Sequence, residues 1–117
     1  MLASLRRLRV QAVRLEYGLQ DDIAAQLSAD GIPFAKEYKL APRNRIDFLV
    51  PSGIGIEVKK GKPNAGQVAS QIERYSRFDS IQTLVLVVER NVFDYASSAN
   101  GKPVHYVSLS KLWGIAL

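Results

Sequence analysis

Cysteine is absent from the 117-residue chain, and His105 is its only histidine. Without cysteine the chain can form neither a disulfide framework nor a thiolate metal site. His105 stands in a strand-like segment with no serine or cysteine nucleophile motif near it, so we expect a packed or surface residue rather than a catalytic one. These shortages exclude disulfide-stapled proteins and cysteine-ligated zinc proteins.

Long apolar runs are also absent, because none approaches the roughly 18 residues of a membrane-spanning helix. The opening segment MLASLRRLRV is interrupted by three arginines, unlike the apolar region of a signal peptide. With no sign of export, the expected location is the cytoplasm. Hydrophobic residues make up 47% of the chain and charged residues 23%, which predicts one globular domain over residues 1–117.

Acidic residues are fewer than basic ones, 11 against 16, which gives a formal net charge of +5 and an isoelectric point near 9.7. An excess of positive charge favours an anionic partner, although many basic proteins bind none. The charge is therefore compatible with a nucleic-acid partner but does not indicate one by itself.

Hydrophobic periodicity predicts the element order α-β-β-β-α-β-β, an α/β fold. Apolar residues recur every three or four positions up to Leu27, as on one face of a helix that Asp30-Gly31 ends. Asn64 is a candidate N-cap for a second helix, with Gln67 in a capping-box-like position. The run TLVLVVE predicts a central strand. The expected ranges are helices at 8–29 and 64–78, strands at 34–41, 45–50, 54–60, 83–89 and 104–110, a helical turn around 93–99, and a turn at Asn100-Gly101.

The segment RIDFLVPSGIGIEVKK, residues 45–60, places charged residues inside two apolar strands. A three-residue turn at 51–53 pairs these strands so that Asp47 faces Glu57. Lys59 lies on the same face of the hairpin as these two acids. The opposite face is apolar, and we expect a helix to cover it; it comprises Ile46, Phe48, Val50, Ile54, Ile56 and Val58.

Two facing carboxylates on one side of a sheet are expected to lie about 5 Å apart. Their repulsion, roughly 3 kcal/mol at an effective dielectric constant of about 20, exceeds the ~1 kcal/mol of a good cross-strand pair. A divalent cation between Asp47 and Glu57 would offset this repulsion, and oxygen ligands favour Mg²⁺ or Mn²⁺. The alternative is that both acids point to solvent at a sheet edge and that Lys59 forms an ordinary surface ion pair.

This arrangement resembles the PD-(D/E)xK nuclease superfamily. Asp47 stands ten residues before Glu57-Val58-Lys59, which fits the E-x-K element, and the element order matches the core of that superfamily. The resemblance implies a restriction-endonuclease-like core with a mixed sheet flanked by helices. It also implies that Asp47, Glu57 and the Val58 carbonyl hold Mg²⁺, with Mn²⁺ as a substitute, and that Lys59 positions or activates water. Ile46 stands where the name-giving proline is usual.

Two further matches lie on the predicted helices. Gln71-Ile72-Glu73-Arg74-Tyr75 fits the Q-x-x-x-Y element of the recombination-exonuclease branch, and many members carry a glutamate on the first helix, here Glu16. The resemblance thus adds Gln71, Tyr75 and Glu16 to the catalytic site. By spacing alone, Gln71 and Tyr75 could instead be a packing pair on one helix face, and Glu16 a solvated residue beside the apolar stripe.

Basic residues around the predicted site form a candidate nucleic-acid surface, for which ordinary solubilising charge is the alternative: Arg43, Arg45, Lys60, Lys62, Arg74 and Arg77. The resemblance implies a nuclease selective for branched or junction DNA that leaves 5′-phosphate and 3′-hydroxyl ends. The nearest kinds are the Holliday-junction-resolvase-like and the stand-alone VRR-NUC-like enzymes, and we expect a homodimer. The alternative is a catalytically silent nucleic-acid-binding or assembly module with the same fold.

Overall fold

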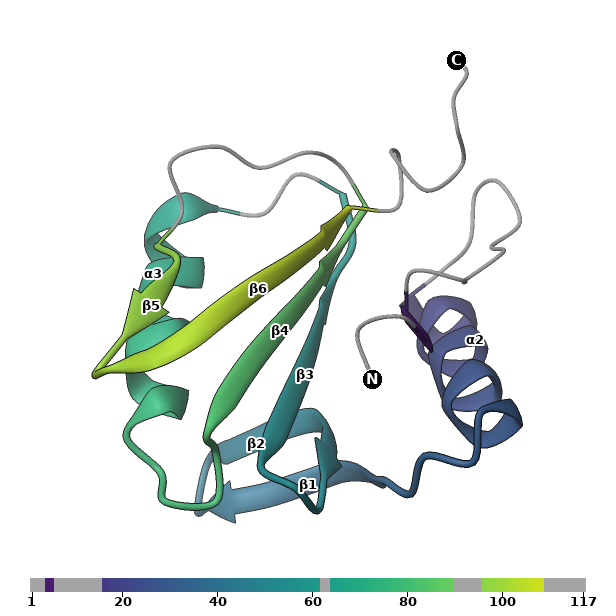
Figure 1. Ribbon diagram of the computed structural model, residues 1–117. Coiled ribbons are helices and arrows are strands. Elements are labelled where there is room, and N and C mark those ends of the chain that lie inside the picture. Colours follow the sequence, from purple (N-terminus) through teal and green to yellow (C-terminus); the bar gives the residue numbers. More distant parts are fainter. Residues whose placement is uncertain (1–3, 6–15, 62–63, 90–95, 109–117) are drawn as a thin grey trace.

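The computed structural model describes residues 4–5, 16–61, 64–89 and 96–108, and only the backbone of Glu16 and Tyr17 (Figure 1). Five sequence predictions fall wholly or partly outside these ranges: residues 8–15 of the 8–29 helix, the side chain of Glu16, Lys62, the start of the helical turn at 93–99, and the end of the 104–110 strand.

The six strands form one mixed sheet in the order β1-β2-β3-β4-β6-β5. β1, β2 and β3 pair antiparallel, whereas β3, β4 and β6 run parallel to their neighbours. The α/β class with a mixed sheet is therefore confirmed, and β1 lies at one edge of the sheet. The bounds are β1 Ala35–Ala41, β2 Asn44–Val50, β3 Ile54–Lys59, β4 Thr83–Val88, β5 Ser98–Ala99 and β6 Lys102–Ser108.

The strand β5 corrects one prediction, because residues 98–99 were expected to end a helical turn. They pair antiparallel with the start of β6 instead. Asn100 and Gly101, between the two strands, both have positive φ angles, 49° and 77°. Two such residues form a tight hairpin turn, which holds the chain extended on either side. The predicted turn at Asn100-Gly101 is confirmed.

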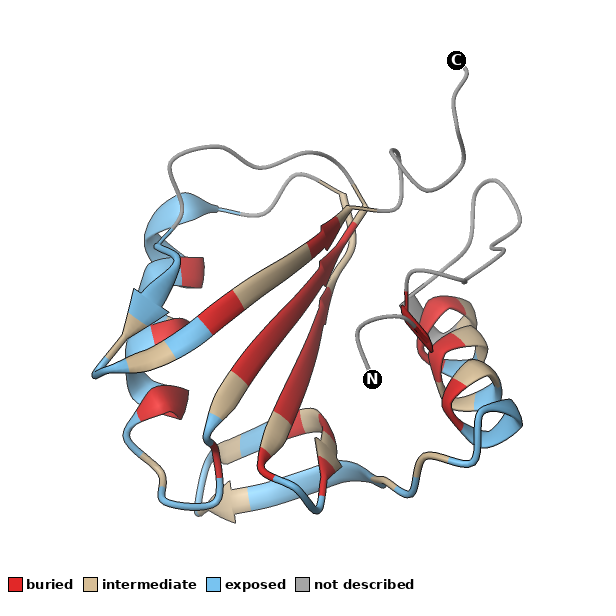
Figure 2. Ribbon diagram, viewed as in Figure 1, coloured by how far each residue is buried: buried red, intermediate tan, exposed pale blue. Residues whose placement is uncertain are grey.

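Two helices cover opposite faces of the sheet, α2 (Glu16–Ala29) on one side and α3 (Ala65–Ser76) on the other (Figure 1). Figure 2 shows that the buried residues concentrate on β3 and β4, between the helices. All but the first residue of β4 are buried. The TLVLVVE run is thus the central strand that its uninterrupted β-branched and apolar character predicted.

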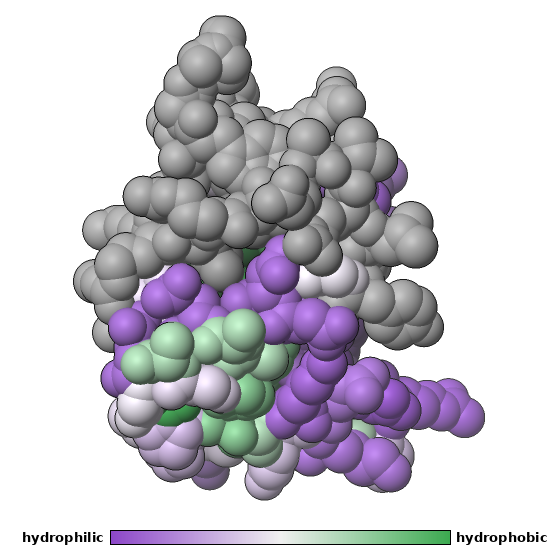
Figure 3. All heavy atoms as spheres, turned by 90° about the vertical axis from the view of Figure 1, so that its right-hand side faces the viewer, coloured by the Kyte–Doolittle hydropathy of each residue, from purple (hydrophilic) through white to green (hydrophobic). Residues whose placement is uncertain are grey.

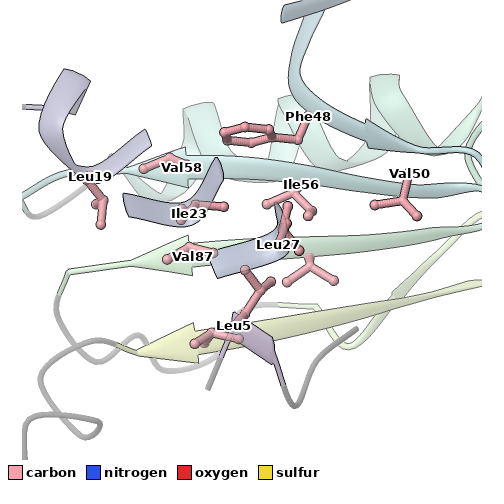
Figure 4. Packing of buried hydrophobic residues seen from close by; sticks show 11 residues of the cluster. Leu5, Leu19, Ile23, Leu27, Phe48, Val50, Ile56, Val58 and Val87 are labelled. Atoms are coloured by element: carbon pink, nitrogen blue, oxygen red, sulfur yellow. The ribbon is translucent and has the colours of Figure 1, made fainter. Parts of the chain in front are cut away.

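The helix α2 buries Leu19, Ile23 and Leu27, which follow one another at intervals of four residues. They pack on Phe48, Val58 and other apolar side chains of β2, β3 and β4 (Figure 4). Leu5 belongs to the same cluster. Burial of each such side chain contributes about 1.5–3 kcal/mol. This face of the hairpin is covered by a helix, as predicted.

On the opposite face, α3 begins where the sequence predicted. The Asn64 side-chain oxygen Oδ1 accepts a hydrogen bond from the Gln67 backbone N–H at 3.0 Å, so Asn64 is the N-cap. Val68, Ile72 and Tyr75 are buried against the sheet. Their spacing leaves Gln67, Gln71 and Arg74 along a flank of the helix.

Ile46 lies on the face of the sheet opposite to the one predicted for it. The pairs Val50–Ile54, Leu49–Gly55 and Phe48–Ile56 confirm the predicted register. Ile46, however, packs with Val68 and Ile72 under α3 rather than with Phe48 under α2. The space for it comes from Gly55, since a Cβ atom built there would lie 2.5 Å from Ile46 Cδ1 and 2.6 Å from Ile81 Cδ1.

We therefore expect Gly55→Ala to destabilise the fold. Ile46 and Ile81 are both fully buried, so neither can move aside without disturbing its neighbours. Overpacking of this kind costs about 1–3 kcal/mol. Chemical denaturation would measure the loss as a lower midpoint, and an unchanged midpoint would show that the two isoleucines repack freely.

The β1–β2 turn contains a second unusual backbone position. Ala41 pairs with Asn44, so Pro42 and Arg43 form the two-residue connection, and Arg43 has a φ of 68°. Glycine or asparagine is the usual choice at such a position, because a side chain there costs roughly 1–2 kcal/mol. The turn thus holds a large cation in a conformation that a glycine would adopt more easily.

Figure 3 shows the side of the molecule on which α2 lies, where a hydrophobic area is bordered by hydrophilic side chains above it and to its right. Of the large hydrophobic residues that the structure describes, only Tyr38 is exposed, at 40%. Among the described residues, no helix has the length and apolar character needed to cross a membrane.

Candidate nuclease site

Asp47 and Glu57 meet where the regular pairing of β2 and β3 ends. The Asp47 backbone N–H donates to Glu57 Oε1 at 3.2 Å, and the Val58 backbone N–H donates to Asp47 Oδ2 at 2.8 Å. Each carboxylate therefore bonds to the backbone of the opposite strand. The structure places the two acids side by side, as the hairpin register predicted.

The Glu57 carboxylate is held in an unfavourable environment. The residue is only 8% exposed. Burial, followed by the negative charge of Asp47, raises the pKa of Glu57 from 4.5 to about 7, while Lys59 acts in the opposite direction. The alternative interpretation, in which the acid points to solvent at a sheet edge, therefore does not describe Glu57. A raised carboxyl pKa in a polar hollow is typical of functional sites, although structural networks also produce it.

Lys59 contributes the positive charge of the site. Its Nζ lies 3.6 Å from Glu57 Oε2, and its side chain is 21% exposed. At this separation the contact is an ion pair rather than a short hydrogen bond. The ammonium is thus close to Glu57 and accessible from solvent.

Glu89, which the sequence analysis did not identify, fixes the chain after Lys59. Its carboxylate accepts from Lys60 Nζ at 3.3 Å and from the Gly61 backbone N–H at 3.2 Å. Its own N–H donates to the Lys59 carbonyl at 3.2 Å. The sequence feature that could have identified Glu89 is its position directly after the buried run of β4. Because β3 and β4 are parallel, the residues that follow them meet at the same edge of the sheet.

Gln71 on α3 carries an unusual polar atom. Its Oε1 is buried and has no hydrogen-bond partner among the described residues. Buried polar atoms are nearly always paired, so an unpaired one is typical of a site that binds water or a ligand. Gln71 and Lys59 line the same hollow on this flank of the helix.

The predicted catalytic residue Tyr75 contacts the backbone of β2. Its hydroxyl donates to the Arg45 carbonyl at 3.1 Å, two residues before Asp47. Burial raises the pKa of Tyr75, and the charge of Glu57 raises it further. Tyr75 thus fastens α3 to β2 beside the acids, which favours a positioning role over the predicted catalytic one.

The prediction for Glu16 lies outside the described side chains. Glu16 is the first residue of α2, and its side chain lies outside the described part of the structure. Within the described residues, no group of three or more His, Cys, Asp or Glu side chains is arranged to hold a metal ion. The carboxylates available beside each other are therefore Asp47 and Glu57.

This donor set nevertheless fits Mg²⁺. Magnesium in proteins is usually held by one or two carboxylates and keeps several of its waters. A hollow of about 210 Å³ lies beside Glu57 and Val58, which leaves room for such waters. Burial and then the negative charge of Asp47 raise the pKa of Glu57, and a cation beside the two carboxylates would offset both effects.

The predicted basic surface divides into separate groups. Arg43, Arg45 and Arg74 line one hollow together with Lys39. Lys60 pairs with Glu89 at 3.3 Å. Arg77 pairs with Glu73, four residues earlier. Lys62 lies outside the described residues. The first group thus lies beside Gln71, and within it Arg45 pairs with Glu37 at 3.7 Å.

Comparisons of the chain with protein-family models, with curated proteins and with solved structures found no significant match. Inference about the function therefore rests on the residues of the site.

Proposed function

We propose that the chain is a metal-dependent nuclease of the PD-(D/E)xK kind, with a restriction-endonuclease-like core, that hydrolyses phosphodiester bonds of DNA. The observation that carries the proposal is the pairing of the buried Glu57 with the half-buried Asp47, with Lys59 Nζ 3.6 Å from Glu57 Oε2. A merely structural role would not require two acids at the end of a strand pair, where their repulsion opposes folding.

The roles of the residues follow from their positions. Asp47, Glu57 and the Val58 carbonyl would hold the cation, which when bound would supply Lewis-acid activation of water and neutralise charge on the phosphate. The Lys59 ammonium could donate a charge-assisted hydrogen bond to a phosphate oxygen. The unpaired Oε1 of Gln71 could accept a hydrogen bond from the attacking water and so orient it. Tyr75 keeps α3 and β2 in register around these groups.

The preferred substrate within this proposal is branched or junction DNA, cut to leave 5′-phosphate and 3′-hydroxyl ends. Neither of the two described helices α2 and α3 resembles a base-reading helix, so recognition of DNA shape and of the phosphate backbone is expected. A homodimer, which would bring two sites to two strands, stays a prediction.

The test is cleavage of labelled single strands, duplexes, flaps and four-way junctions with Mg²⁺, with Mn²⁺ and with EDTA. We expect metal-dependent cutting, fastest on the four-way junction, and a loss of at least about 100-fold in Glu57→Gln. Glutamine keeps the Oε1 acceptor for the Asp47 N–H, so the hairpin should stay intact. Circular dichroism and thermal unfolding of the variant would establish this.

Calorimetric titration with Mg²⁺ separates the proposal from its alternative. The nuclease should bind the ion without DNA, and Glu57→Gln should bind it much more weakly. Tight DNA binding by the wild type with no cutting under either metal, and no heat of Mg²⁺ binding, would favour the catalytically silent module.

A further inference from the structure

Three hollows lie in a row along one flank of α3. The first is beside Glu57, and the second shares Lys59, Asn64 and Gln67 with it. The third shares Gln71 and Arg74 with the second. Asn64, Gln67, Gln71 and Arg74 follow one another at intervals of three or four residues, so they lie on one side of the helix. We call this continuous depression, lined by these four residues, the α3 groove.

The charge of the α3 groove is almost entirely positive. Lys59 and Lys60 lie at one end, and a cluster at the other end comprises Lys39, Arg43, Arg45 and Arg74. Glu57 is the only acid among the described residues that line the three hollows. A lining of this kind is complementary to a polyanion.

Ion pairing divides the cations of the groove into two sets. Lys59 pairs with Glu57, Lys60 with Glu89, and Arg45 with Glu37 at 3.7 Å. Among the described residues, Lys39, Arg43 and Arg74 have no carboxylate within ion-pair distance. These three cations line the same hollow at one end of the groove, where an external anion would complete their contacts.

The backbone of Arg43 supports the same conclusion independently. Its φ of 68° would suit glycine better, yet the turn carries an arginine beside Gln71 and Arg74. Backbone strain of this kind often occurs at functional positions. The guanidinium at the tip of the turn extends the α3 groove beyond the end of the helix.

We propose that the α3 groove holds one strand of nucleic acid by its phosphates, running from the Arg43 turn to the Asp47–Glu57 pair. The 12 residues of α3 extend about 18 Å, enough for several consecutive phosphates. The amides of Asn64, Gln67 and Gln71 can hydrogen-bond to sugars and phosphates without reading base identity. This inference rests on the proposed nuclease function, for which it supplies the path of the substrate strand.

The test measures binding of a fluorescent mixed-sequence DNA strand by anisotropy in EDTA, where no cutting occurs, over a series of salt concentrations. The variants are Arg74→Gln and Arg43→Gly, with Lys36→Gln as the control, because Lys36 lines none of the three hollows. We expect each groove variant to bind about three- to fivefold more weakly and to lower the slope of log K against log salt by about 1. Lys36→Gln should bind like the wild type.

Arg43→Gly carries a second readout, because glycine suits the positive φ. Its thermal midpoint should equal or exceed that of the wild type while its affinity for the strand falls. If Arg43 had only a structural role, Arg43→Gly would lower the thermal midpoint and leave the affinity for the strand unchanged.

The outcomes distinguish the two proposals. Wild-type binding and cutting, with groove variants that bind like Lys36→Gln, would overturn the α3 groove and leave the nuclease intact. Binding that weakens only in the groove variants, without any cutting, would support the groove and overturn the nuclease. A wild type that binds no strand at low salt would overturn both.

Discussion

At pH 8, Glu57→Gln is expected to be more stable than the wild-type chain by about 2–3 kcal/mol. The reason is the burial of the carboxylate beside Asp47, which raises the pKa of Glu57 from 4.5 in the unfolded chain to about 7 in the fold. The fold therefore binds the proton more tightly than the unfolded chain does. The stability that the fold gains from binding this proton is complete below pH 4.5 and is lost as the pH rises through about 7.

Glutamine resembles the protonated acid and does not ionise, so the variant should keep this contribution at every pH. The free energy of unfolding, measured with urea at pH 4 and pH 8, should differ between the proteins only at the higher pH. The groups facing Glu57 are Asp47, Lys59 and Tyr75. The exposed Glu37, changed to glutamine, is the control. An equal difference at both pH values would contradict the ionisation argument.

The second large effect is expected from Lys59→Ala in the cleavage assay, with a loss of about 100- to 1000-fold. Removal of one preorganised donor from a hydrolytic site typically costs this much. Lys59 is the cation nearest Glu57, and its partial exposure leaves it accessible to a phosphate. Single-turnover rates at saturating Mg²⁺ would separate this loss from weaker binding of DNA.

Lys36→Ala is the matched control for that variant. Lys36 also pairs with a carboxylate, that of Asp21, at 3.3 Å, but it lies on the edge strand β1 and contacts α2. Its removal should leave the cleavage rate within about twofold, since an exposed pair contributes at most about 1 kcal/mol. Equal losses in both variants would mean that general charge, rather than the position of Lys59, supports cleavage.

Glu57→Gln is expected to raise stability and to lower cleavage, and Arg43→Gly is expected to keep or raise stability and to lower affinity for the strand. A chain selected for stability alone would replace Glu57 by a neutral residue, and Arg43 by glycine. At both positions the native residue lowers the free energy of unfolding, and binding of an ion or an anionic strand there would offset that loss. Stability and function commonly conflict in this way at binding sites.

Much of the fold could be predicted because local signals determined it. The short turn at 51–53 fixed the hairpin register, and with it the approach of Asp47 to Glu57. The Asn64 cap and the apolar stripe ending at Leu27 also depend on neighbouring residues alone. The continuous run of β4 identified the central strand without knowledge of its partners.

The remaining features depend on contacts between distant segments. Ile46 changed sides because Gly55, on the next strand, leaves a space under α3 that no alternation pattern reveals. Glu89 lies beside the site because β3 pairs parallel with β4, and that pairing depends on the arrangement of the whole sheet. Tyr75 fits the expected motif, but only its bond to the Arg45 carbonyl indicates what its hydroxyl does.

The bond from the Val58 amide to Asp47 Oδ2 also makes the site observable by spectroscopy. In an ordinary strand pair that amide would bond to a carbonyl whose electron density hardly changes with solution conditions. Here it bonds at 2.8 Å to a carboxylate oxygen of the proposed ion site. The ¹⁵N and proton chemical shifts of Val58 therefore report the charge at Asp47 directly, and its hydrogen exchange reports how often the two strands separate there.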